Sequence, residues 1–262
     1  MKSTHLAILA FAIVMALSIF FASQDRGGRP LPPPVPPVVT ATSPQPEVVL
    51  PKVDQRLCTA VAILLDSSSS MKQDVRTKTG GKQPKYRIAR EALERILTHT
   101  EEALRGKPDL HLELGIYQFS SDVEVLQPLR PFNAAEVRGN LGRIRPSTGT
   151  AIGRALEVGF RDLTASGCTR KHIVCITDGE NTSGPSPDRI AGVFHQATGG
   201  EVAIHFVAFD IDARKFRFLE RVNGRALEAS DEAELQTQLT EIYDKRILAE
   251  APLVEPTVET DK

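Results

Sequence analysis

Carboxylate and hydroxyl side chains follow two apolar runs of the sequence, at the points where those runs end. The run LCTAVAILLD ends at Asp66 and is followed by four serines. Alternation of side chains in the turn after a strand would aim Asp66, Ser68 and Ser70 at one point. Asp178 ends a second such run, and Thr150 precedes a predicted helix. These carboxylate and hydroxyl oxygens form a hard ligand set, which suits Mg²⁺ or Mn²⁺.

The elements that must position these residues alternate between strands and helices. Continuous apolar runs, typical of strands buried on both faces of a parallel sheet, occupy residues 57–66, 171–179 and 201–211. Two further strands flank a tight turn at Ser121 and Asp122, which predicts a hairpin. A short strand is predicted near 226–229. Helical spacing of apolar residues occurs at 86–104, 134–144, 151–163, 187–197 and 231–247.

This order of elements predicts an α/β fold: a doubly wound, mostly parallel sheet with one antiparallel edge strand and helices on both faces. In such a sheet, ligands bind at the carboxyl ends of the strands. Asp66 and Asp178 lie at two of those ends. The hydrophobic content of 41% supports a sizeable core. We therefore expect one domain over residues 53–248.

The sequence from about Leu57 to Leu248 resembles a von Willebrand factor type A (vWA) domain. That family's metal-ion-dependent adhesion site (MIDAS) has the pattern D-x-S-x-S after the first strand, a Thr before a central helix and an Asp after the fourth strand. The segments DSSSS at 66–70, GTAIGRAL at 149–156 and ITDGENTSG at 176–184 match this pattern. The resemblance also implies the strand order 3-2-1-4-5-6, which places the first and fourth strands side by side.

By this resemblance, five residues hold a divalent cation, Mg²⁺ in first place and Mn²⁺ or Ca²⁺ as alternatives. Ser68, Ser70 and Thr150 are expected to bind it directly. Asp66 and Asp178 are expected to act mostly through water and to orient the hydroxyls. The sixth position would take a carboxylate from a partner protein, which implies a partner with an exposed Asp or Glu. Neutral hydroxyls leave Mg²⁺ underneutralised, and an incoming carboxylate restores the charge balance.

The expected function is binding by a membrane-tethered, extracytoplasmic vWA module, and not catalysis. The sequence places no His, Cys or Lys as an obvious general base beside the metal. Two alternatives stay open at this point. One is a metal-dependent hydrolase that uses the same carboxylates on bound water. The other is a scaffold subunit of an envelope complex in which the metal is structural.

A basic segment separates the predicted metal site from the first long helix. Ala89 comes 18 positions after Met71, a longer connection than is usual in vWA domains. From Met71 to Arg90, seven Lys or Arg stand against one acid, Asp74. We expect this segment to form a rim that attracts an acidic partner, and the alternative is a solvated flexible loop. The rim residues are Lys72, Arg76, Lys78, Lys82 and Lys85.

The two ends of the chain are predicted to lie outside the vWA domain. Residues 1–23 form a predicted signal anchor or transmembrane helix, since 6–22 contains Ser18 as its only polar residue. Lys2 favours a cytoplasmic N-terminus, whereas cleavage of a signal peptide would make the protein secreted. Residues 24–52 hold nine of the 18 prolines and predict an extended linker. Residues 249–262 carry four acids and predict a disordered acidic tail.

Cys58 and Cys168 form a candidate disulfide, since export would permit one. If the first and fourth strands are neighbours, both cysteines lie near the lower edge of the sheet. Strict register would leave their Cα atoms ~8 Å apart, beyond the usual limit near 7 Å. A curled loop at Cys168 would close that gap, so the sequence leaves the pairing open.

Composition excludes several other classes of protein. The net charge of −1, the absence of Trp and the three Tyr argue against nucleic-acid binding. Three cysteines exclude a disulfide-dense scaffold and a four-cysteine zinc site.

Four further residues are expected in structural roles. His172 and His205 are expected in the core or as caps. Asp210 and Asp212 are expected as strand-end caps rather than as a second cation site.

Overall fold

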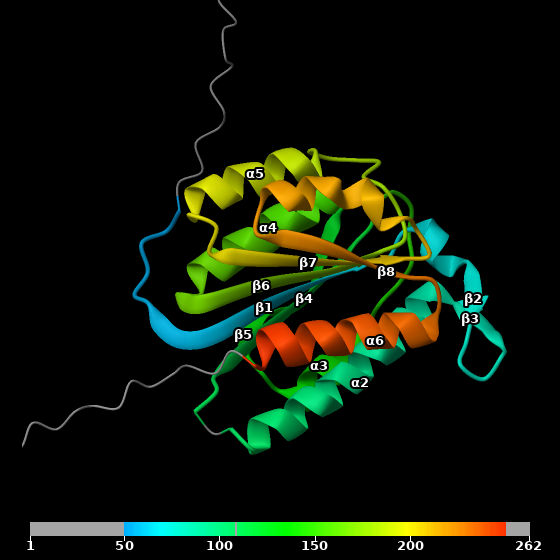
Figure 1. Cartoon of the computed structure of the whole chain (residues 1–262), viewed down its shortest axis with the longest axis horizontal. Helices are drawn as coiled ribbons and strands as arrows, with labels where there is room; N and C mark the ends of the chain where they lie inside the picture. Colours follow the sequence, from blue (N-terminus) through cyan, green and yellow to red (C-terminus); the bar gives the residue numbers. More distant parts are fainter. Residues whose placement is uncertain (1–49, 108, 250–262) are drawn as a thin grey trace, which may run out of the picture. The chain divides into compact units, whose positions relative to one another are not determined.

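The computed structural model describes residues 50–107 and 109–249, which all lie within one compact unit, Pro44–Lys262 (Figure 1). The strands are β1 (Arg56–Asp66), β2 (Asp74–Arg76), β3 (Lys82–Pro84), β4 (Leu112–Phe119), β5 (Val123–Pro131), β6 (Cys168–Thr177), β7 (Val202–Phe209) and β8 (Gly224–Ala229). The α-helices are α2 (Lys85–Arg105), α3 (Ala134–Leu141), α4 (Ile152–Ala165), α5 (Pro187–Ala197) and α6 (Glu232–Ile242). Further helical segments are η1 (Ser69–Lys72), η2 (Ala213–Arg221) and η3 (Tyr243–Ile247).

Within the described residues, no helix has the length and apolar character needed to cross a membrane. The predicted anchor over 1–23, the linker up to residue 49 and the tail from residue 250 lie outside the described residues. The anchor, the linker and the acidic tail therefore stay predictions from the sequence.

Six of the strands form one sheet in the order β5-β4-β1-β6-β7-β8. β4 and β5 are antiparallel, and all the other neighbours are parallel. This arrangement confirms the predicted fold class, the predicted strand order and the hairpin at Ser121 and Asp122. β1 is central, and every residue from Cys58 to Asp66 is buried because helices cover both of its faces.

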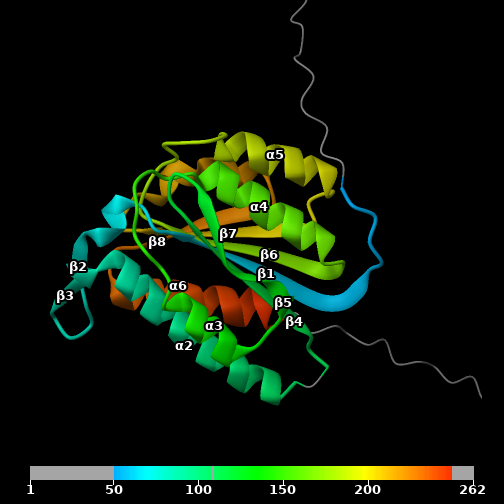
Figure 2. The same cartoon turned by 180° about the vertical axis from the view of Figure 1, so that it is seen from behind.

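Helices α4 and α5 cover one face of the sheet, and α2, α3 and α6 cover the other (Figures 1 and 2). Side chains of β1 alternate between the two cores, as the period of a strand requires. Val61, Ile63 and Leu65 pack in the core beneath α2 and α6. Ala62 and Leu64 pack in the core beneath α4 and α5. Helices on both faces thereby hold the sheet in place, and the loops lie at the ends of its strands.

The basic segment after Met71 folds into an ordered hairpin. β2 and β3 pair antiparallel over three residues each. Val75 is buried and joins the core beneath α2. The backbone N–H of Lys78 donates to Glu232 Oε2 at 3.0 Å, at the start of α6. These two contacts hold the hairpin against the body of the domain.

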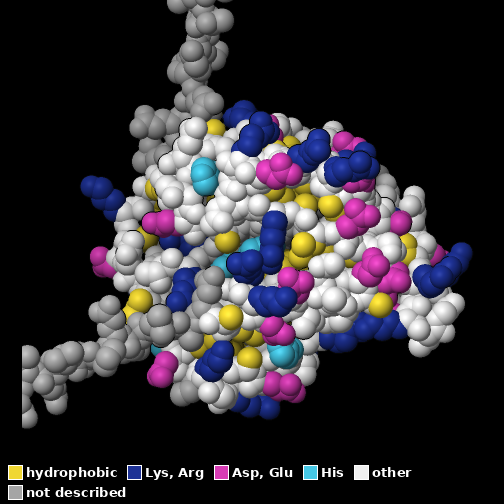
Figure 3. Space-filling model, viewed as in Figure 1, with side chains coloured by type: hydrophobic (Ala, Val, Ile, Leu, Met, Phe, Trp, Pro, Cys, Tyr) yellow, Lys and Arg dark blue, Asp and Glu magenta, His cyan; other side chains and the backbone are white. Residues whose placement is uncertain are grey.

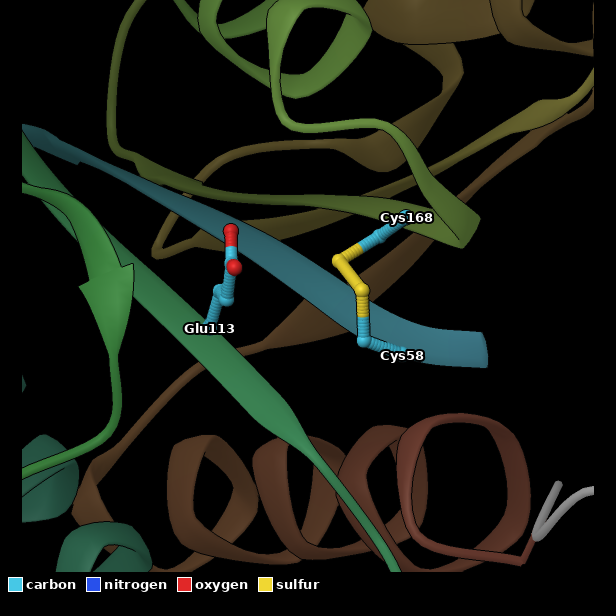
Figure 4. A group of neighbouring side chains, drawn as sticks. All are labelled: Cys58, Glu113 and Cys168. Atoms are coloured by element: carbon cyan, nitrogen blue, oxygen red, sulfur yellow. A yellow bond between two sulfur atoms is a disulfide. The ribbon is translucent and has the colours of Figure 1, made fainter. Parts of the chain in front are cut away.

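Cys58 and Cys168 form a disulfide, with their Cα atoms 4.8 Å apart (Figure 4). The register of β1 and β6 shifts between Arg56 and Thr59, which brings the two cysteines closer than a strict register would. Glu113 lies within 4.8 Å of both sulfurs. Sulfurs bonded to each other offer no thiolate to a metal, and Glu113 forms an ion pair with Arg56 at 2.8 Å. This cluster is therefore a structural link and not a metal site.

Loss of this disulfide is expected to lower the free energy of unfolding by about 4 kcal/mol, because the bond closes a long loop in the unfolded chain. Denaturant unfolding of the Cys58→Ala/Cys168→Ala variant against the wild type measures this change. Reducing agent should destabilise the wild type and leave the variant unaffected. Alkylation of the unreduced, denatured wild type should find one free thiol, Cys175. Three free thiols would contradict the bond.

Two buried histidines lie side by side on neighbouring strands, His172 on β6 and His205 on β7. His172 Nδ1 is 3.4 Å from His205 Nε2. Burial lowers the pKa of His172 to about 4, with a smaller effect from Arg170. Burial, His172 itself and two arginines lower the pKa of His205 to about 3. Both imidazoles are therefore neutral at pH 7. They lie inside the sheet, away from the carboxyl ends of β6 and β7.

Acid is expected to destabilise the protein through this histidine pair. In the folded protein the pKa of each histidine lies below its unfolded value of about 6.5. The neutral pair therefore favours the folded state above pH 6.5, and this contribution to stability is lost as the pH falls toward 4. The free energy of unfolding should fall by about 3 kcal/mol between pH 7 and pH 5. The loss should be smaller in the His172→Gln/His205→Gln variant, measured by urea unfolding at each pH. Equal pH dependence in the two proteins would contradict the prediction.

Candidate metal site

Asp66 ends β1 at the carboxyl edge of the sheet, beside the end of β6. Its carboxylate is buried and has two donors: the backbone N–H of Ser68 reaches Oδ1 at 2.7 Å, and the hydroxyl of Thr177 reaches Oδ2 at 2.6 Å. Burial raises the pKa of Asp66 to about 6 in spite of these hydrogen bonds. The charge of Asp178 nearby acts in the same direction as burial. A cation at this edge would offset the unfavourable burial of the carboxylate charge.

The serine run after β1 directs two hydroxyls toward the end of β6. Ser68 Oγ lies 2.9 Å from Ser70 Oγ. The Ser70 hydroxyl donates to Asp178 Oδ1 at 2.7 Å. This chain of contacts joins residues 108 positions apart in the sequence. It exists because β1 and β6 are parallel neighbours, so their carboxyl ends meet.

Thr150 reaches the same edge from the loop before α4. Its backbone N–H donates to the hydroxyl of Thr182 at 2.9 Å, and its carbonyl accepts the N–H of Thr182 at 2.8 Å. Its hydroxyl lies beside Gly179, at 3.6 Å from where a Cβ would stand. Gly149 has a φ of 80°, a left-handed conformation that glycine adopts without strain. The loop after β6 thus holds Thr150 next to Asp178.

All five predicted ligands therefore lie at one edge of the sheet and offer only oxygen atoms. Two carboxylates and three hydroxyls fit a hard divalent cation such as Mg²⁺. The hydroxyls of Ser68, Ser70 and Thr150 would hold it as neutral ligands. Asp66 and Asp178 would supply the negative charge. The cation would supply an acceptor site for one further anionic ligand from outside.

The structure corrects the position of Lys85, which was predicted on the exposed rim. Its side chain is 4% exposed, and its Nζ lies 3.0 Å from Asp178 Oδ2 and 2.8 Å from Asp210 Oδ2. Lys85 is the first residue of α2, where the chain turns from the hairpin into the domain. Burial opposes its charge, but hydrogen bonds from Nζ to Asp210 and Asp178 outweigh burial and raise the pKa of Lys85. An ammonium group thus already neutralises part of Asp178.

Asp210 belongs to this charged cluster and is not a simple strand-end cap. It has a φ of 57°, and within the described residues it is the only non-glycine residue with a positive φ. That backbone conformation is uncommon outside glycine and recurs at functional sites. Asp212 does act as a cap, since its Oδ1 accepts the N–H of Arg214 at 2.8 Å. The two acids therefore have different partners: Asp210 pairs with Lys85, and Asp212 pairs with Arg214.

The structure also shows supporting residues beside the predicted ligands. Thr177 donates to Asp66, and Thr182 holds Thr150. Asn181 Oδ1 accepts the backbone N–H of Gly153 at 3.1 Å in the first turn of α4. All three lie within four residues of Asp178 in the sequence, so their proximity to a predicted ligand was the available signal. The other four rim residues, Lys72, Arg76, Lys78 and Lys82, are exposed.

Comparison with known proteins agrees with this fold. Residues 61–180 match the family model described as von Willebrand factor type A domain. No curated protein sequence matches the chain. The sheet order and the solved structures below show a vWA/Rossmann-like α/β fold for the described residues, and the family match covers part of them.

Three solved structures illustrate the similarity. The PilB minor pilin from Streptococcus sanguinis is 16% identical with a TM-score of 0.62, over 78% of this chain and 64% of that chain. A von Willebrand factor type A protein from Catenulispora acidiphila is 21% identical with a TM-score of 0.56, over 71% and 42%. Proximal thread matrix protein 1 from mussel byssus, with a zinc-occupied MIDAS motif, is 19% identical with a TM-score of 0.56, over 75% and 49%. This chain spans less than two thirds of each of them.

Proposed function

We propose that this protein is a membrane-tethered, extracytoplasmic vWA module that binds a protein partner through a divalent cation, Mg²⁺ in first place. The partner supplies the carboxylate of an Asp or Glu. The observation that carries the proposal is the chain of contacts from Asp66 through Ser68 and Ser70 to Asp178. The residues that hold the cation are Asp66, Ser68, Ser70, Thr150 and Asp178.

The charge balance of the site favours an incoming carboxylate. Because Lys85 already pairs with Asp178, a bound cation has only Asp66 as an unshared carboxylate. Hydroxyl ligands add no charge. A carboxylate from a partner would therefore restore neutrality and bind where the cation is. The zinc-occupied MIDAS of the mussel protein supports a divalent cation at the equivalent edge of this fold.

The proposed location rests on the N-terminal sequence and on the disulfide. The apolar run at 6–22 has the composition of a signal anchor, and the proline-rich linker would hold the domain away from a membrane. Disulfides such as Cys58–Cys168 persist in oxidising compartments outside the cytosol. Both observations support an extracytoplasmic domain.

Affinity capture tests the proposal. The full chain, purified in detergent, is immobilised and exposed to membrane and envelope extracts in Mg²⁺ or in EDTA, with Asp66→Asn as the control variant. A partner retained only by the wild type in Mg²⁺ is the expected result. Retention of the same proteins in all three conditions would defeat a metal-bridged interaction.

Two other functions use the same residues and have distinct outcomes. A metal-dependent hydrolase would turn over substrate in Mg²⁺ and lose turnover in Asp66→Asn. A scaffold subunit with a structural metal would melt at a lower temperature in EDTA but keep its partner. We place the hydrolase second because Asp178 pairs with Lys85, and this ion pair holds the carboxylate of Asp178 in place.

The exposed rim is expected to speed association with an acidic partner. Neutralising Lys72, Arg76, Lys78 and Lys82 to Gln should slow association about tenfold at low salt and change dissociation little. Surface plasmon resonance at 20–300 mM salt with the captured partner measures both rates. Association that is unchanged at low salt would contradict the steering role.

A further inference from the structure

A second pocket lies at the opposite edge of the sheet from the metal site. It has a volume of about 330 Å³. The amino ends of β6, β7 and β8 form it, together with Arg246 of η3. Because these strands are parallel, their amino ends lie a full strand length from Asp66 and Asp178. The lining residues that matter here are Arg170, His172, His205, Arg225 and Arg246.

The charge of this pocket is strongly basic. Burial lowers the pKa of Arg225, and the charge of Arg246 lowers it further, against a smaller opposite effect of Glu241. At the rim, Lys171 and Glu201 pair with each other at 3.0 Å. Within residues 50–107 and 109–249, no carboxylate forms an ion pair with Arg225 or Arg246. Two guanidinium groups thus face one hollow without a matching anion from the described part of the chain.

Three buried polar atoms of the pocket have no hydrogen-bond partner among residues 50–107 and 109–249. Arg225 Nε and Nη2 and His205 Nδ1 are buried and have none among the described residues. His205 is 5% exposed and pairs in register with Arg225, so the two side chains share one face of the sheet. Figure 3 shows Lys and Arg side chains around a hollow on this face, with histidine visible inside it. A buried polar group without a hydrogen-bond partner is destabilising, so these atoms favour a bound acceptor.

The histidine pair can present a donor to this hollow. When His172 Nδ1–H donates to His205 Nε2, the proton of His205 lies on Nδ1. Nδ1–H is then available to an acceptor in the pocket, beside the guanidinium of Arg225. Guanidinium groups bind carboxylates and phosphates with two parallel hydrogen bonds. A volume of this size accommodates a metabolite-sized molecule.

We propose that this pocket binds an oxyanion, the phosphate or carboxylate group of a small molecule, with Arg225, Arg246 and His205 as its donors. The anion satisfies the unpaired donors and neutralises the two arginines. The site is separate from the metal edge and does not depend on the proposed metal function.

Titration calorimetry of the full chain in detergent tests this site, with inorganic phosphate and citrate as probes in a chloride buffer. We expect saturable binding of one anion per chain, weakened at least tenfold by Arg225→Gln. Arg161→Gln is the matched control, because Arg161 is exposed on α4 and pairs with Glu157. It should bind like the wild type. Absence of saturable binding by both probes, or equal losses in the two variants, would overturn the proposal.

Folding and an internal source of carboxylate are controlled in the same series. Circular dichroism melting confirms that Arg225→Gln is folded, and Arg225→Lys, which keeps the charge without the fork, should bind with intermediate affinity. The acids Glu250, Glu255, Glu259 and Asp261 are then replaced together by their amides. Tighter phosphate binding in that chain supports the pocket, with the C-terminal acids as competitors. Unchanged binding supports it with an external anion as the ligand.

Discussion

Replacing Lys85 by methionine is expected to tighten Mg²⁺ binding about tenfold and to lower the stability of the metal-free protein by about 3 kcal/mol. The ammonium of Lys85 lies on Asp178 Oδ2, so a bound cation must share that carboxylate with another positive charge. Removing the ammonium removes this repulsion. Without metal, the same change leaves the buried carboxylate of Asp178 without its cation, which is strongly destabilising.

Two measurements separate these opposite effects. Titration calorimetry with Mg²⁺ gives the affinity, and urea unfolding in EDTA gives the stability. Lys82→Met is the matched control, because Lys82 belongs to the same basic segment but is exposed. Lys85→Arg keeps the charge and should retain most of the stability. An Mg²⁺ affinity that is the same in Lys85→Met and the wild type would show that Lys85 does not compete with the metal.

Asp66→Asn is expected to weaken Mg²⁺ binding about 10- to 100-fold, the range for loss of an outer-shell partner of a metal site. Asn keeps the volume of the side chain, and its carbonyl can accept the Ser68 N–H as Asp66 does. The hydroxyl of Thr177 can reorient to accept from the amide. Without metal, the free energy of unfolding of Asp66→Asn should therefore stay within about 1 kcal/mol of the wild-type value. The substitution also removes a buried negative charge, which is unfavourable in the folded state.

Thermal melting with and without Mg²⁺ detects this loss. Wild-type protein should melt at a higher temperature as Mg²⁺ is added, because a ligand that binds only the folded state stabilises it. Asp66→Asn should show no such increase at millimolar Mg²⁺. Asp188→Asn, an exposed acid on α5, should respond like the wild type. An equal rise in the melting temperature of all three proteins would exclude Asp66 from the cation site.

Most of the fold followed from local patterns in the sequence. The apolar run that ends at Asp66 and the helical spacing of Ile88, Ala92 and Ile96 each reflect the period of one element. The run is buried from Cys58 to Asp66, and the three helical residues are buried as well. The hairpin around Ser121 and Asp122 followed for the same reason. The five predicted ligands lie at strand or helix ends, where alternation and parallel strand order bring them to one edge.

The interpretation of the basic segment was incomplete because sequence does not report which lysine is buried. Five lysines and arginines were assigned alike to an exposed rim, yet Lys85 lies inside at the start of α2. Its partner Asp210 follows β7, 125 residues further along the chain. Only the strand order β1-β6-β7 brings the ends of those strands together. No local period of the sequence contains that contact.

Sequence alone determined the class of fold and the residues that meet at the carboxyl edge, because these depend on short-range periodicity and on a motif with fixed residue types. The strand order followed from the resemblance to vWA domains that this motif carries. Tertiary structure decided the pairing of Cys58 with Cys168, the burial of Lys85 between Asp178 and Asp210, and the basic pocket around Arg225. Each of these depends on how elements that are distant in the chain pack against one another, and the disulfide and the pocket depend on the register between strands. Register sets which side chains share a face and an edge, and a shift of one or two residues would separate them.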